Sequence, residues 1–126
     1  MDNIYLGTTL VAIRIRRFAE GTAPMTAPEE ALQLLTLKYP EGHDIKPHRH
    51  RPRKRVTAVL QECLLVIRGK IRVDLYDETG TCFRKIVARA GQAVVLLGVA
   101  HGVRFLESSR VYELKNGPFI DDKEFL

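Results

Sequence analysis

Two histidines separated by one residue, His48 and His50, have a spacing that points to metal chemistry. On an extended strand, side chains two positions apart point to the same face, so both imidazoles would lie on one side. Glu62 heads an alternating apolar run, and His101 follows a second apolar segment. Imidazoles and carboxylates together suit iron, manganese, zinc or nickel. The sequence therefore predicts one divalent transition metal ion, with the ligands His48, His50, Glu62 and His101.

Short segments of alternating apolar and polar side chains, separated by turn residues, make up most of the chain. A period of two is typical of strands with one buried face, and hardly any segment has a helical period. We expect strands over 10–18, 32–39, 56–60, 61–68, 70–77, 81–88, 92–97, 102–107 and 111–115, with the first at a sheet edge. This pattern predicts an all-β sandwich or barrel without an internal domain boundary.

The paired histidines lie in a segment that resembles the first motif of the cupin superfamily. That motif is a glycine, five residues, His-x-His, a short gap, a glutamate, six residues and a glycine. Gly42, His48, His50, Glu62 and Gly69 match it here, with both flanking spacings preserved. Eleven residues separate His50 from Glu62, where the family has three or four.

A later segment resembles the second cupin motif, which is a glycine, five residues, Pro-x-Gly, two residues and a histidine. Gly91, Gly98 and His101 match it with one residue missing, and Leu96 stands in place of the proline. The resemblance implies that His101 is a ligand of the same metal ion, while the turn before it can differ from the family's.

The resemblance implies a fold as well as a site. The implied fold is a single cupin domain over residues 1–126, which is an antiparallel jelly-roll barrel. Its core would lie at about 32–118, with the N-terminal strand and the C-terminal tail packed outside. The chain is most similar to small single-domain cupin metalloproteins, mostly uncharacterised. Some of these accompany enzymes of sugar-nucleotide metabolism or polysaccharide biosynthesis, which implies a small, anionic or sugar-derived ligand.

A basic run follows the paired histidines. Its arginines, which are Arg49, Arg51, Arg53 and Arg55, would rim the barrel mouth and attract an anionic substrate; a solvated loop is the alternative. Clustered cations can also bind nucleic acid. We do not favour that interpretation, because aromatic residues are absent from the run and tryptophan is absent from the chain.

Glu113 and Lys115 share one face of the strand expected over 111–115. If that face lines the barrel interior, the pair could bind substrate or serve as acid and base near the metal, because buried charges are costly and usually functional. An exterior salt bridge is the more ordinary alternative. Both residues are therefore candidates for substrate binding.

Length and composition limit the classes of protein further. A chain of 126 residues can bury a core, and its net charge of +5 favours anionic partners in general. Two cysteines without a metal or redox spacing indicate reduced thiols in the cytoplasm, and neither a signal peptide nor a membrane span is expected. We expect a homodimer, because exposed edges of a small β-fold need covering.

Three classes of function remain open. A metal enzyme is the leading one, with dioxygenase chemistry expected from iron and isomerase, epimerase or lyase chemistry from zinc or manganese. A non-catalytic ligand sensor would use the same pocket without turnover. A metal-free structural jelly roll would leave the histidines without a role.

Overall fold

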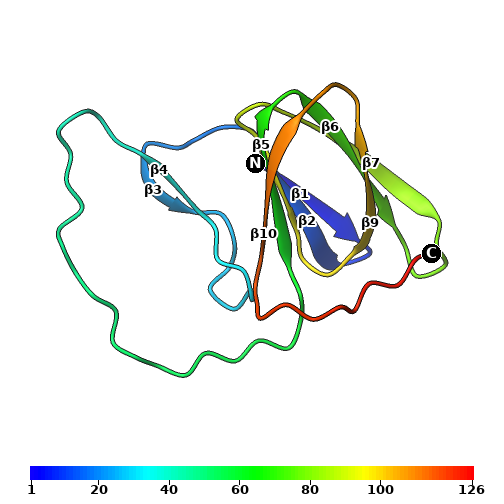
Figure 1. Cartoon of the computed structure of the whole chain (residues 1–126), viewed down its shortest axis with the longest axis horizontal. Coiled ribbons are helices and arrows are strands. Elements are labelled where there is room, and N and C mark those ends of the chain that lie inside the picture. The colour runs from blue at the N-terminus through cyan, green and yellow to red at the C-terminus, as the bar shows by residue number, and fades with distance from the viewer.

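A computed structural model describes all residues 1–126, and its ten strands form three antiparallel sheets (Figure 1). The all-β prediction is confirmed. The strands are β1 (Asp2–Leu6), β2 (Thr9–Ile15), β3 (Gly21–Pro24), β4 (Leu35–Lys38), β5 (Glu62–Arg68), β6 (Lys70–Tyr76), β7 (Cys82–Arg89), β8 (Ala93–Leu96), β9 (Ala100–Phe105) and β10 (Arg110–Lys115). The chain contains no helix of the length and hydropathy that a membrane span requires.

The main core lies between two sheets, one with the order β1-β2-β8-β5-β10 and one with the order β7-β6-β9. Strand β6 illustrates why the sequence folds this way. Its side chains alternate regularly, so Ile71, Val73 and Leu75 are fully buried while their neighbours are only partly covered. The facing strands contribute apolar side chains such as Leu64 and Val94 to the same cluster.

The other face of the larger sheet carries a second apolar cluster around Ile13, Cys63 and Val95. Residues of the segment 25–34, including Leu32 and Leu34, pack against it. Burial raises the pKa of the Cys63 thiol to about 11, because the thiolate would be desolvated. The larger sheet is therefore covered on both sides over its central strands.

The strand expected over 10–18 forms as β2, but it is not at a sheet edge, contrary to the prediction. Strand β2 pairs with both β1 and β8, and its Ala12 is completely buried in the main core. The sequence analysis overlooked β1, whose Ile4 joins that core, and β3, which pairs only with β4. A strand's place in a sheet depends on which distant segments pair with it, and its own alternation cannot give that order.

The segment between β4 and β5 has no regular structure. No strand forms at 56–60, where one was expected, and His48 and His50 do not lie on a strand. Val56 and Val59 remain exposed, and the segment forms no ladder with any strand. The sheets do not join into a closed barrel, and β9 and β10 each end a sheet with a free edge.

Candidate functional site

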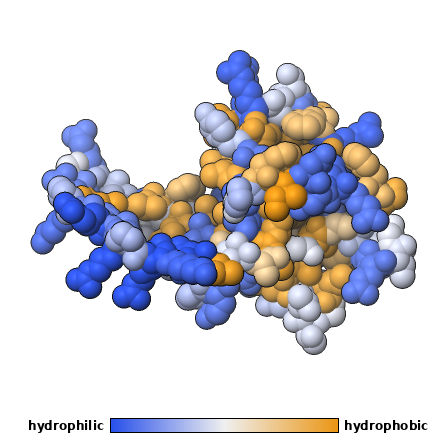
Figure 2. Space-filling view, turned by 60° about the horizontal axis from the view of Figure 1, so that its bottom comes forward, coloured by the Kyte–Doolittle hydropathy of each residue, from blue (hydrophilic) through white to orange (hydrophobic).

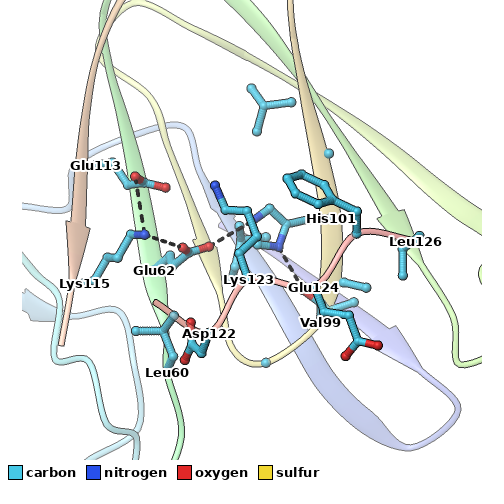
Figure 3. A pocket seen from close by; sticks show the side chains of 16 residues that line it. Leu60, Glu62, Val99, His101, Glu113, Lys115, Asp122, Lys123, Glu124 and Leu126 are labelled. Atoms are coloured by element: carbon cyan, nitrogen blue, oxygen red, sulfur yellow. Dashed lines mark hydrogen bonds and ion pairs between the residues drawn. The ribbon is translucent and has the colours of Figure 1, made fainter. Parts of the chain in front are cut away.

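Glu62 is the centre of a charged cluster at the open end between the two large sheets (Figure 3). Its Oε2 lies 2.8 Å from Nε2 of His101, and its Oε1 lies 3.3 Å from Nζ of Lys115. The Lys115 amine is also 3.8 Å from Oε2 of Glu113. Glu62 is buried, so its carboxylate meets the imidazole and the amine with little water around it.

Strand register explains why these side chains meet. Lys115 of β10 is the direct partner of Glu62 on β5, and directly opposed residues share one face of a sheet. His101 of β9 lies opposite Leu75 of β6, whose side chain is fully buried between the sheets. His101 therefore points inward, across the gap between the sheets, toward Glu62.

The orientation of the His101 ring leaves one nitrogen directed at Glu62. Nδ1 donates a hydrogen bond to the carbonyl oxygen of Val99 over 2.9 Å, so Nε2 faces the carboxylate. Histidines that bind metals commonly donate their other ring N–H to a backbone carbonyl in this way. The distance of 2.8 Å between Nε2 and Oε2 of Glu62 is that of a direct polar contact between the two side chains.

A pocket of about 560 Å³ adjoins this cluster and is strongly acidic. The C-terminal residues 122–126 form one of its walls, and Figure 3 places Asp122, Lys123 and Glu124 opposite the strands. Its acidic side chains are Glu62, Glu113, Asp122 and Glu124, and its basic ones are His101, Lys115 and Lys123. Such a lining favours a cation. The sequence analysis did not include the tail in the site, although its acidic composition was a usable signal.

His48 and His50 lie elsewhere, in the exposed segment between β4 and β5. Their rings are in edge-to-face contact with centroids 5.1 Å apart, and Nδ1 of His48 is bonded to the carbonyl oxygen of Lys46 at 2.7 Å. His43, outside the motif, stacks on Tyr39. No three or more His, Cys, Asp or Glu side chains lie close enough together to hold a metal ion. The predicted ligands thus form two separate pairs.

The predicted substrate-binding residues also divide into two groups. Glu113 and Lys115 line the pocket beside Glu62. Arg49, Arg53 and Arg55 do not line it, and lie on the exposed segment with the paired histidines. The arginine rim of the pocket is therefore not assembled in this conformation.

Gln61 and Asn116, which were not predicted as part of the site, fix the chain next to Glu62. The Gln61 side chain is buried, accepting a hydrogen bond from the Leu32 amide and donating one to the Glu30 carboxylate. The Asn116 side chain accepts a hydrogen bond from the backbone N–H of Gln61. It donates hydrogen bonds to Thr57 Oγ1 and to the Val59 carbonyl oxygen. Their sequence context gave no signal, because the contacts join segments far apart in the chain.

The site brings a carboxylate, an imidazole and an amine together beside an open pocket. No family model, curated protein or solved structure matches this chain. The chemistry of these side chains is therefore the basis on which its function can be inferred.

The Lys115 amine gives the cluster an expected pH dependence. Its pKa is raised above the usual 10.5, mainly by the hydrogen bond to Glu62 and then by the charge of Glu113. Folding favours the protonated amine, so its stabilisation is complete below pH 10.5 and is lost as the pH rises through the folded-state pKa. We expect Lys115→Met to remove part of the alkaline fall in unfolding free energy, measured by urea titration from pH 8 to 11.

The control for this test is Lys38→Met. Lys38 pairs with Glu20 at 2.7 Å, but both side chains are more than half exposed, so solvent screens the pair. Its alkaline stability curve should parallel that of the unchanged protein. Parallel curves for Lys115→Met as well would mean that the Glu62–Lys115 contact contributes nothing to folding.

Proposed function

We propose that this protein is a metal-binding cupin with a jelly-roll fold. One divalent transition metal ion, namely iron, manganese, zinc or nickel, would be held by His48, His50, Glu62 and His101. The observation that carries this proposal is the contact of the Glu62 carboxylate with Nε2 of His101, whose Nδ1 is held by a backbone carbonyl. We further propose that the ligand is a small anionic or sugar-derived molecule.

The strand order supports the jelly roll. Such a fold has about eight strands in two sheets, and β5 to β10 supply six of them as β8-β5-β10 and β7-β6-β9. The free edges of β10 and β9 are the places where two more strands would add. The segment between β3 and β5 contains one short strand, β4, and the His-x-His sequence, whose two imidazoles would share one face if it became extended.

Addition of the His-x-His segment at the edge of β9 would also assemble the metal site. His101, Val103 and Phe105 share the inward face of β9, opposite the fully buried Leu75, Val73 and Ile71 of β6. Val103 and Phe105 are nonetheless 38% and 58% exposed, so this edge has no covering strand.

A strand placed there would set its inward side chains beside His101. His48 already holds Nδ1 on a backbone carbonyl, leaving Nε2 for a ligand.

Each residue then has a defined task. Glu62 and the three histidines would bind the ion, which would supply Lewis acidity or oxygen activation. Lys115 would bind an anionic group next to it, and Glu113 would hold the amine in place. Arg49, Arg53 and Arg55 would move to the pocket with the histidines and offset its acidic lining. The two cysteines are free thiols, in line with the cytoplasmic location that we propose.

Elemental analysis of untagged protein purified without chelator tests the proposal. We expect close to one metal ion per chain, and a loss of at least about tenfold in metal affinity for His101→Ala or for His48→Ala combined with His50→Ala. His43→Ala is the matched control, because His43 stacks on Tyr39 and should leave the metal content unchanged. Absence of metal from the unchanged protein after incubation with each of the four ions would refute the site.

A further inference from the structure

The arm, defined as residues 21–24 and 35–60, stands apart from the rest of the molecule. It comprises β3, β4 and the long segment that leads to β5, and Figure 1 shows it as a wide arc beside the two large sheets. Strands β3 and β4 contact each other but make no comparable contact with any other strand. In Figure 2 the arm projects from the left of the body. Thr36 of β4 is buried, whereas the face that carries Leu35 and Leu37 is only about half covered by its own chain.

The arm and the body each expose apolar side chains. On the arm, Leu35 and Leu37 share one face of β4 and are nearly half exposed. On β10, Tyr112 and Leu114 share the outward face and are 64% and 49% exposed. Free strand edges with exposed apolar side chains are surfaces that proteins normally cover.

The charges of the arm and the pocket are complementary. Residues 46–55 include six lysines and arginines and no acid. The pocket has four carboxylate side chains against two lysines and His101. Because both surfaces belong to one chain, two copies can each offer a basic arm and an acidic pocket, which is the arrangement that a two-fold dimer needs.

Hydrogen bonds with Asn116 fix the base of the arm. From there the arm runs away from β9 of the same chain. The Asn116 side chain accepts a hydrogen bond from the Gln61 amide at 2.8 Å, and it donates to Thr57 Oγ1 at 3.1 Å and to the Val59 carbonyl at 2.9 Å. These contacts hold residues 57–61 beside the end of β10, and the chain before them arcs outward (Figure 1). A strand that follows this course is placed to meet another molecule.

We propose that two copies of this chain exchange arms, so that His48 and His50 of one copy complete the metal site formed by Glu62 and His101 of the other. In this dimer β4 adds to the free edge of the partner's β10, and the His-x-His segment adds to the free edge of the partner's β9. The basic arm lies on the acidic pocket, and Leu35 and Leu37 are covered. The inference rests on the proposed metal-binding function and assigns its ligands to two chains.

A mixed dimer tests the exchange. One chain carries His48→Ala and His50→Ala with one affinity tag, and the other carries His101→Ala with a second tag; the two are co-expressed and purified through both tags. With exchanged arms, the first chain's body receives intact histidines from the second, so one of the two sites is complete. We expect about half the metal content per chain of the unchanged protein. Each variant expressed alone should bind almost none.

The possible results separate the two proposals. If the unchanged protein binds no metal, the proposed function fails, and light scattering still reports whether the dimer forms. If it binds metal but the mixed dimer has none, each site is completed within one chain and the exchange is refuted. Failure to recover any mixed dimer, with a metal-loaded monomer in light scattering, also refutes it. Tyr112→Asp should lower both the dimer fraction and the metal content.

Discussion

A Gly69→Ala variant is expected to lose about 4 kcal/mol of unfolding free energy, a large effect for one methyl group. Gly69 separates β5 from β6 at a φ of 90°, where residues with a side chain are strained. An added Cβ would also lie 2.6 Å from the Ser108 carbonyl oxygen and 2.8 Å from Cβ of Ser109, and would overlap Oγ of Ser109. Two of these atoms cannot swing aside, because they belong to the backbone or lie next to it.

The Ser109 region matters because it joins β9 to β10. Its Oγ accepts a hydrogen bond from the Lys70 amide at 3.0 Å and donates to the Glu107 carbonyl at 2.8 Å. Displacing it would disturb the strands that carry His101 and Lys115. We therefore expect Gly69→Ala to reduce stability, measured by urea titration, and, under the proposed function, to reduce metal content as well.

Gly80→Ala is the matched control for Gly69→Ala. Gly80 has a similar φ of 80° in the β6–β7 turn, but nothing lies within 4 Å of its added Cβ. It should lose only about 1–2 kcal/mol, the cost of the backbone conformation alone. Equal losses at the two positions would mean that the contact with Ser108 and Ser109 is not what makes Gly69 necessary.

A Gln61→Ala variant is expected to lose about 2–3 kcal/mol of unfolding free energy. The Gln61 side chain is almost fully buried and accepts a hydrogen bond from the Leu32 amide at 2.9 Å. It also donates to Oε2 of Glu30 at 2.6 Å. Truncation leaves the Leu32 backbone amide and the Glu30 carboxylate without these hydrogen-bond partners at a partly buried position. Equilibrium urea unfolding, with the midpoint and slope compared, measures the effect.

Gln33→Ala provides a test of the same chemistry at an exposed position. Its amide donates to the carbonyl oxygens of Ala27 and Glu30, both at 2.9 Å, but water can replace it. The loss should be under about 1 kcal/mol. A loss at Gln33 as large as that at Gln61 would show that burial does not set the value of these bonds.

Local patterns predicted the strands of the main core well. The alternation in β6 and the turn at Gly80 are properties of adjacent residues, and both are found where the sequence placed them. The region before β5 was predicted less well. A strand was expected at 56–60, but a strand also needs ladder hydrogen bonds to a neighbouring strand, and this segment forms none.

The candidate site was predicted in the same uneven way. Glu62 and His101 were named from motif spacing, and the structure brings them to 2.8 Å from each other. Gln61 and Asn116 were not predicted as part of the site, because they act through contacts between segments that are 29 to 59 residues apart. No spacing rule detects such pairs.

The sequence by itself determined the all-β fold class and most of the alternating core strands, because these depend on side-chain type and on the period of neighbouring residues. Only the tertiary structure decided that β2 lies inside a sheet, that β9 and β10 keep free edges, and that the predicted ligands form two separate pairs. These features depend on which distant segments pair. Pairing is set by the total burial and hydrogen bonding of the folded chain, which no local pattern contains.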